Sequence, residues 1–241
     1  MSLRDGLFLH WPVDPVELRP HVPDRLTLET RDGRAWLSVL PFVLTNVGIR
    51  GAPPFARLAF PELNVRTYVR YRGDPGLYFF SVDVGNAFVA AATGRTTRLP
   101  VYYARMQVSG GGSGIDEDRV TFVSTRDERT PELGTPTKAT AATGPTPARF
   151  SVTYRPTGPA ATAEEGSLEY WLAERRRFYA PRGDRVLTGE IAHEPWALQP
   201  ADVTIHENTM FAANDLPEPS GEPTAQFCGE HRLTGSIPRR L

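Results

Sequence analysis

The segment of residues 62–70 combines the side chains that most often bind or transform small polar molecules. A carboxylate, an amide, a phenol and guanidinium groups recur at every second position, at Glu62, Asn64, Arg66, Tyr68 and Arg70. Successive side chains of a β-strand point to opposite faces, so these residues would share one face and mostly apolar residues the other. The polar face is either an ordinary solvated surface or the lining of a polar cavity.

If this face points inward, the same residues would form a ligand site. Arg66 could hold a carboxylate or phosphate in a two-pronged hydrogen bond, and Asn64 is a second ligand-binding candidate. Glu62, removed from water, would have a raised pKa and could act as a general acid or base, while Tyr68 would supply a neutral donor. On an exposed face, Glu–Arg pairs would contribute only about 0.2–1 kcal/mol.

Candidates outside the segment each have two readings. Tyr102 is either a ligand-facing hydroxyl or an aromatic core residue. Arg175 is either a surface side chain with a packed stem or a buried partner for Glu62 or for a ligand anion. His193 is either a histidine near the pocket or a purely structural histidine. Asp83 either caps the turn that follows it or forms a second pocket acid beside Glu62.

Several other chemistries are excluded by residue type and spacing. The histidines lack the close spacing of a metal motif, so we expect no metal site and no cofactor. Cys228 is the only cysteine and is expected in the core. The basic residues are arginines except for Lys138, which lies in a Pro- and Thr-rich stretch and is expected to be solvated. An imine intermediate would therefore need Lys138 or the N-terminus.

Composition narrows the partners. The chain has 27 basic and 28 acidic residues, which gives no electrostatic footprint for nucleic acid or for a membrane surface. No apolar run approaches the roughly 20 residues that span a bilayer, and Arg4 and Asp5 interrupt any secretory signal. We expect a cytoplasmic protein that has one domain over residues 1–241 and binds a small-molecule ligand. Exposed strand edges would allow it to form a homo-oligomer.

The elements that must position these residues are mostly short strands. Asp32-Gly33 predicts a hairpin between 26–30 and 35–44, and Asn86 predicts the cap of a short helix. Apolar spacing predicts a helix over 168–179, which would place Arg175 on its apolar side and would cover the apolar face of the 62–70 strand. Further strands are expected at 7–10, 63–71, 77–84, 101–108, 119–125, 150–154, 185–193, 202–206 and 225–233. This pattern is typical of a β-dominated α+β barrel with a few short helices.

Ordered motifs along nearly the whole chain resemble those of the YqjF-like family of bacterial proteins. They are Phe8-Leu-His-Trp-Pro12, Leu18-Arg-Pro-His-Val-Pro23, Pro61-Glu-Leu-Asn-Val-Arg-Thr-Tyr-Val69, Gly76-Leu-Tyr-Phe-Phe-Ser-Val-Asp83, Leu99-Pro-Val-Tyr-Tyr-Ala104, Ser167-Leu-Glu with Leu172-Ala-Glu-Arg175, and His193-Glu-Pro-Trp-Ala-Leu-Gln199. That family is similar in fold to acetoacetate decarboxylase. The resemblance implies a cone-shaped β-barrel around a small polar pocket.

The decarboxylase hallmark itself is incomplete in this chain. It is a Gly-Arg-Glu step followed by Pro-Lys-Lys on a strand, and here Gly94-Arg95 match but Thr96 replaces the glutamate. Pro100 matches the proline, whereas Val101 and Tyr102 stand where the two lysines would be. The resemblance therefore implies the fold and pocket of the decarboxylase without its imine chemistry. It also implies that Glu62 lies near the position of the family's pocket glutamate.

Two functions fit these residues, from different classes. The first is a binding protein for a small carboxylate-bearing molecule, held by Arg66 or Arg175 and selected by Tyr68 and Tyr102. The second is a lyase or isomerase without an imine intermediate, in which Glu62 moves a proton and an arginine stabilises an enolate. A structural module with a filled interior is the third reading.

Overall fold

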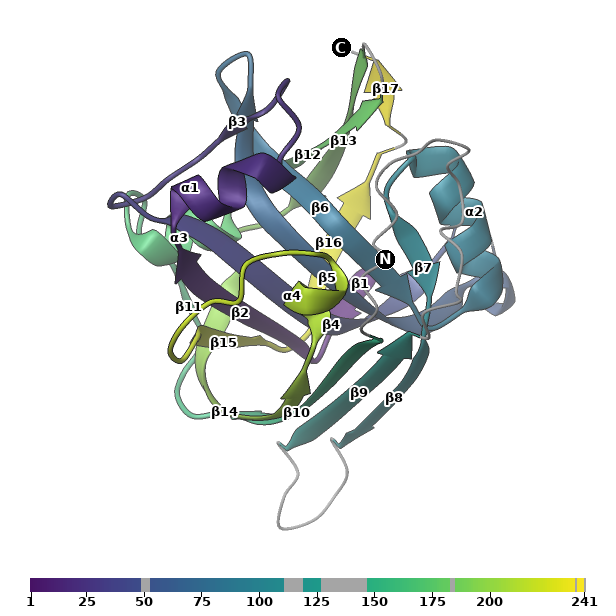
Figure 1. Ribbon diagram of the computed structural model, residues 1–241. Coiled ribbons are helices and arrows are strands. Elements are labelled where there is room, and N and C mark those ends of the chain that lie inside the picture. Colours follow the sequence, from purple (N-terminus) through teal and green to yellow (C-terminus); the bar gives the residue numbers. More distant parts are fainter. Residues whose placement is uncertain (49–52, 111–118, 127–146, 183–184, 237, 241) are drawn as a thin grey trace.

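The computed structural model describes residues 1–48, 53–110, 119–126, 147–182, 185–236 and 238–240, and these are mostly strands with a few short helices (Figure 1). Lys138 lies outside the described residues. The strands are β1 (Ser2–Arg4), β2 (Gly6–Val13), β3 (Thr27–Leu28), β4 (Ala35–Val47), β5 (Leu58–Tyr71), β6 (Asp74–Val84), β7 (Val101–Tyr103), β8 (Arg105–Gly110), β9 (Val120–Arg126), β10 (Ala148–Pro156), β11 (Ala161–Thr162), β12 (Arg177–Arg182), β13 (Arg185–His193), β14 (Ala197–Asn208), β15 (Thr224–Cys228), β16 (His231–Gly235) and β17 (Arg239–Arg240). The helices are α1 (Pro15–Leu18), η1 (Arg19–His21), η2 (Pro54–Ala56), α2 (Ala87–Thr97), α3 (Leu168–Ala173) and α4 (Met210–Ala213).

The strand pairings form a closed circuit on one side of the long strands. Strand β4 pairs with β5 and β5 with β6, while β6 pairs in parallel with β12. From β12 the pairings continue through β13, β16 and β1 and return to β4. A second run leads from β4 through β2, β15, β14, β10 and β9 to β8. Strands β4 and β5 thus have a layer on each face.

Each face of β5 belongs to a different hydrophobic core. The first core lies within the closed circuit and takes Tyr68 of β5, together with Phe79 of β6 and Phe178 of β12. The second core takes Leu63 and Val65 of β5, and strands β9 and β10 with helix α4 complete it. Because both faces are covered, the polar row of β5 lies inside the protein from Asn64 to Tyr68.

A β-bulge in β6 decides which of its side chains enter which core. The register moves from Val65↔Ser81 to Arg66↔Phe79, which leaves Phe80 as the extra residue. Phe79 therefore joins the first core, whereas Ser81 accepts a hydrogen bond from Asn214, the residue that follows α4, on the second side. Strict alternation would place Asp83 on the same face as Phe79, but the bulge moves Asp83 to the opposite face.

Caps and turns follow the sequence closely. Asp14 caps α1 by accepting a hydrogen bond from the Val16 amide, and Asn86 caps α2 in the same way from Val89. The Asp32-Gly33 turn is present, with φ of 53° and 74°, and an Arg31–Arg34 bridge closes it. The hairpin predicted around this turn is nevertheless wrong, because β3 pairs with β5 instead of β4.

Two further expectations fail where tertiary pairing overrides local pattern. The predicted helix over 168–179 ends at Ala173, because Arg177–Arg182 pair with β13 as a strand. The expected continuous strand 101–108 divides into β7, parallel to β6, and β8, antiparallel to β9. Helix α3 also lies on the polar side of β5, since the Trp171 and Tyr68 ring centroids are 4.7 Å apart. Its predicted place over the apolar face is therefore wrong.

The helices of the described residues are all too short or too polar to cross a membrane.

Candidate functional site

The polar row of β5 is buried along most of its length. Asn64 is 4 % exposed, Arg66 7 % and Tyr68 0 %, while Glu62 is partly buried. Arg70, at the end of the strand, reaches the surface. The structure thus brings Glu62, Asn64, Arg66 and Tyr68 to the first core, where a polar group without a partner carries a cost.

Tyr68 forms a hydrogen-bonded triangle with two residues from neighbouring strands. Its hydroxyl lies 2.8 Å from Ser38 Oγ on β4 and 3.1 Å from His10 Nδ1 on β2, and Ser38 Oγ lies 2.7 Å from His10 Nδ1. Burial, followed by the charge of Arg66, lowers the pKa of His10 to about 3, so its ring is neutral at physiological pH. His10 Nε2 is buried without a hydrogen-bond partner among the described residues.

Arg66 is the buried cation of this row. Its guanidinium carbon lies 6.0 Å from the Phe8 ring centroid, and Tyr68 is its hydrogen-bonding neighbour. Burial lowers the pKa of Arg66, yet a guanidinium stays charged near neutral pH. Within the described part of the chain, no carboxylate pairs with Arg66, and its Nε atom has no hydrogen-bond partner.

Glu62 has the electrostatics of an acid that exchanges a proton near neutrality. Its pKa is raised to about 7, chiefly by desolvation, with the Asp83 charge adding to the rise and a hydrogen bond to Asn64 opposing it. Asn64 Oδ1 is a further buried atom without a partner in the described residues. Glu62 and Asn64, which can accept and donate protons or hydrogen bonds, therefore lie in the same row as the Arg66 cation.

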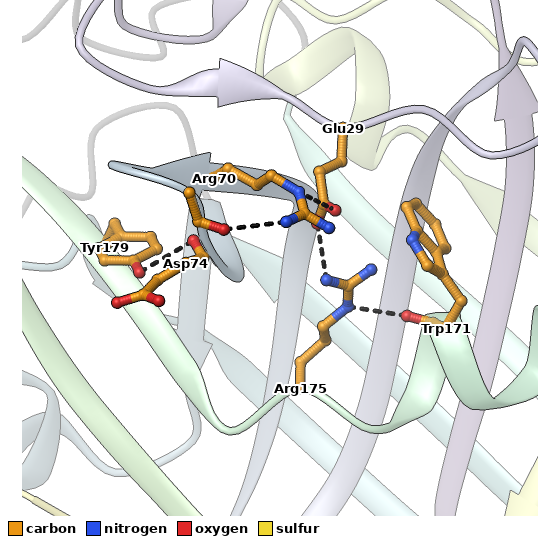
Figure 2. Close-up of polar contacts among 7 residues, drawn as sticks. Glu29, Arg70, Asp74, Trp171, Arg175 and Tyr179 are labelled. Carbon is orange, nitrogen blue, oxygen red and sulfur yellow. Dashed lines mark hydrogen bonds and ion pairs between the residues drawn. The ribbon is translucent and has the colours of Figure 1, made fainter. Parts of the chain in front are cut away.

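Figure 2 shows where Arg175 lies. Its Nη1 atom is 2.6 Å from Glu29 Oε2, and its Nε atom donates a hydrogen bond of 2.7 Å to the Trp171 carbonyl. The guanidinium carbon stands 4.5 Å from the Trp171 ring centroid and 5.2 Å from that of Tyr68. The other Glu29 oxygen accepts a hydrogen bond of 2.7 Å from Arg70 Nε. Arg175 is thus buried, as one reading required, but its partner is Glu29 and not Glu62.

His193 is buried beside the first core. Its Nδ1 atom donates a hydrogen bond of 2.7 Å to the Glu194 carbonyl, and its ring centroid lies 4.7 Å from that of Trp196. Burial is the largest cause that lowers the pKa of His193. Its Nε2 atom has no hydrogen-bond partner among the described residues.

Tyr102 is not brought to Arg66. It stands beside Asp83 in the β6–β7 register, and the Arg126 guanidinium carbon lies 3.9 Å from the Tyr102 ring centroid. Asp83 pairs with Arg126 at 3.2 Å and has its pKa raised to about 6, chiefly by desolvation. These three residues form a separate polar cluster, on the face of β6 that meets the second core. The cap proposed for Asp83 is wrong because this ion pair takes its carboxylate.

Val101, the residue before Tyr102, faces the first core. Val101 is fully buried there, next to Val82 of β6. Cys228 is buried in the same core, as expected, and burial raises the pKa of its thiol to about 12. The residues described hold no group of three or more His, Cys, Asp or Glu side chains that could bind a metal ion.

Sequence reasoning missed His10, Ser38 and Glu29. His10 and Ser38 are single polar residues inside apolar strands, a pattern that indicates a buried hydrogen bond and could have identified them. Glu29 follows the short strand β3 and has no such signal, because its partner Arg175 is 146 positions away.

A cavity of about 460 Å³ opens elsewhere, between β14, α4 and the loop 218–223. Its lining includes Trp11 and Phe211 and none of the predicted site residues. The polar row and this cavity are therefore different places in the fold.

Comparison with known proteins gives relatives over almost the full chain. The model of the family DUF2071, described as an uncharacterized conserved protein, matches residues 1–232. The uncharacterized protein YqjF of Bacillus subtilis (strain 168) is 40 % identical over 225 residues, which is 92 % of this chain and 84 % of that protein.

The solved structures similar to this chain share the acetoacetate decarboxylase-like fold. The enduracididine biosynthesis enzyme MppR in complex with pyruvate matches with a TM-score of 0.64 and 12 % identity, over 99 % of this chain and 88 % of MppR. Acetoacetate decarboxylase from Legionella pneumophila matches with a TM-score of 0.58 and 13 % identity, over 100 % of this chain and 87 % of the decarboxylase. At this identity the likeness establishes the fold alone.

Proposed function

Because the chain belongs to the DUF2071 family and has an acetoacetate decarboxylase-like fold, we propose that it binds a small carboxylate-bearing molecule at Arg66. One observation carries this proposal. Arg66 is a buried cation without a carboxylate partner in the described residues, and a ligand anion would provide the missing counter-charge. MppR, a structural neighbour, is described in complex with pyruvate, which makes a small carboxylate the natural first probe.

Neighbouring groups support the same proposal. Among the described residues, the buried atoms without a hydrogen-bond partner include nitrogen atoms of His10, Trp36, Arg66 and Arg175 and an oxygen atom of Asn64. Buried polar atoms normally have partners, so the presence of these atoms near the polar row favours a polar occupant. We assign Arg66, Tyr68, Asn64 and His193 to the site, and we place Tyr102 in the separate Arg126 cluster.

Arg66→Gln tests the binding proposal. The unmodified protein is expected to bind pyruvate in a calorimetric titration. The variant is expected to bind it roughly ten- to a hundred-fold more weakly, as for the loss of a charged hydrogen bond worth about 1.5–3 kcal/mol. Arg149→Gln is the matched control, because Arg149 is half exposed and pairs only loosely with Glu207 at 3.7 Å. Equal binding by Arg66→Gln and the control would contradict the proposal.

The raised pKa of Glu62 favours a second candidate function, a lyase or isomerase that uses Glu62 as its acid or base. Exchange of the methyl protons of pyruvate in D₂O, followed by ¹H NMR, detects such proton transfer. An enzyme would accelerate this exchange, and Glu62→Gln would abolish the acceleration while pyruvate still binds. A binding protein would show no acceleration and would keep its affinity in the same variant.

We also propose that no imine forms. By the resemblance to acetoacetate decarboxylase, Val101 and Tyr102 stand where its two lysines would be, and Lys138 is the only lysine in the sequence. Borohydride treatment with pyruvate, followed by mass spectrometry, is expected to leave the protein mass unchanged. A reduced adduct on Lys138 or on the N-terminal amine would overturn this part of the proposal.

A further inference from the structure

The charged side chains around the polar row are not all paired with an opposite charge. Arg175 faces the Glu29 carboxylate, with side-chain exposures of 5 % and 6 %, so these two buried charges neutralise each other. The ring of His10 is neutral. Arg66 alone among the cations of this row lacks an acidic partner in the part of the chain that the structure describes.

Several hydrogen bonds fix Glu29 in place, so its ion pair with Arg175 does not open to make Arg175 available to a ligand. Its two oxygens accept hydrogen bonds of 2.6 Å from Arg175 and 2.7 Å from Arg70, and both guanidinium groups surround it in Figure 2. The Glu29 amide also donates a 2.9 Å hydrogen bond to the Tyr68 carbonyl. Arg70 is 47 % exposed, so water screens its charge, whereas Arg175 depends on Glu29.

We infer that Glu29 restricts the Arg66 site to one negative charge, so that the ligand is a monocarboxylate and dicarboxylates are rejected. This inference rests on the proposed function and names the substrate class of the same site. A second ligand carboxylate would enter a desolvated region where Arg175 is already neutralised and where Glu29 repels it. Selection would then come from an unfavourable contact as much as from a favourable one.

The surroundings of the row fit an apolar remainder of the ligand. Phe8, Trp36 and Trp196 belong to the first core, and Trp171 packs against it. An aromatic and aliphatic lining stabilises a hydrocarbon body and offers nothing to a second charge. Arg175 therefore serves as the counter-charge of Glu29, with its Nη1 and Nε atoms bound to Glu29 and to the Trp171 carbonyl, and is not the anion clamp.

Butanoate and succinate test the inference, because they have the same number of carbon atoms and differ by one carboxylate. Titrations at pH 6.5, where Glu62 is mostly protonated, are expected to give at least tenfold tighter binding of butanoate by the unmodified protein. Glu29→Gln frees the Arg175 charge and is expected to tighten succinate binding at least tenfold, with butanoate changed less than threefold. Glu190→Gln is the control, since Glu190 forms an exposed pair with Arg239 and is expected to change neither affinity.

The double variant Glu29→Gln/Arg175→Gln removes both charges and is expected to restore the preference for butanoate. If Glu29→Gln does not fold, as judged by circular dichroism, Arg175→Gln replaces it. That variant is expected to keep both the butanoate affinity and the tenfold preference, and loss of either would overturn the inference.

The outcomes separate this inference from the proposal on which it rests. Succinate binding as tight as butanoate binding in the unmodified protein would overturn the charge restriction and leave the Arg66 site standing. Equal succinate affinity in Glu29→Gln and Glu190→Gln would overturn the role of Glu29. Binding of neither acid by the unmodified protein would overturn the proposed function itself.

Discussion

At the scale of single residues, burial acts in opposite directions on the two titratable groups nearest the row. It raises the pKa of Glu62 to about 7 and lowers that of His10 to about 3, because in both cases it disfavours the charged form. Near neutral pH the His10 ring is therefore uncharged, and Glu62 is about half protonated. Arg66, which keeps its proton, is left as the dominant charge of the row.

The raised pKa of Glu62 predicts a specific dependence of stability on pH. Between pH 4.5 and about 7 the unfolded chain releases this proton while the folded protein keeps it, so the free energy of unfolding falls as pH rises. The fall attributable to Glu62 is expected to be up to about 3 kcal/mol. Asp83 acts in the same direction and His10 in the opposite one, so a variant is needed to isolate the contribution.

Urea unfolding of Glu62→Gln across this pH range provides that measurement. The variant is expected to lack the Glu62 part of the slope, so its stability relative to the unmodified protein improves toward pH 7. Glu164→Gln, at an exposed position, serves as the control and is expected to follow the unmodified protein. Parallel curves for all three proteins would show that Glu62 has an ordinary pKa.

At the scale of elements, the close approach of β6 to β12 depends on a glycine. A Cβ atom at Gly76 would lie 2.6 Å from the Tyr179 ring and 3.0 Å from the Arg177 carbonyl oxygen. The parallel pairing of these strands therefore leaves no space for a side chain. This pairing also closes the circuit around the first core.

Gly76→Ala is expected to lower the free energy of unfolding by about 1–3 kcal/mol, because the strand must shift to relieve this contact. Gly229→Ala is the matched control, since its nearest neighbour would be 3.9 Å away, and it is expected to be close to neutral. Thermal denaturation compares the two variants. Equal melting temperatures of the two variants would mean that β6 and β12 accommodate the added methyl group without loss of stability.

The same elements show what the sequence can and cannot predict. Alternation along 62–70, the caps at Asp14 and Asn86, and the β5–β6 pair were predictable because each depends on local periodicity or turn chemistry. The bulge at Phe80 has no glycine to mark it, and it changes the face of every residue beyond it.

The helix predicted to Tyr179 fails for a different reason. Its apolar spacing also suits a strand at the distal end, and only the distant partner β13 decides between the two structures. The candidate site likewise has residues that local pattern predicts and residues that only distant contacts bring together. Arg66 and Glu62 follow from one strand, whereas the Glu29–Arg175 pair joins parts of the chain that local patterns do not connect.

At the scale of the whole molecule, the two cores share strands β4 and β5. Loss of either core would expose one face of these strands, so we propose that the chain folds as one domain. Urea unfolding is expected to give one transition with the same midpoint by tryptophan fluorescence and by far-ultraviolet circular dichroism. Two separated midpoints would contradict a single cooperative unit.

The shared strands also explain how a polar row is kept inside a β-rich molecule. Hydrogen bonds with His10 and Ser38 satisfy the Tyr68 hydroxyl of the row. The nearby Arg175 cation is paired with the Glu29 carboxylate. Arg66 keeps an unmatched charge in the described structure, which is the feature that a ligand would complete.

The most direct test of this account is a crystal structure of the protein soaked with pyruvate. The account predicts the pyruvate carboxylate within hydrogen-bonding distance of the Arg66 guanidinium group, on the first-core side of β5. Pyruvate bound only in the cavity beside α4 and the loop 218–223, with Arg66 surrounded by protein side chains, would contradict it.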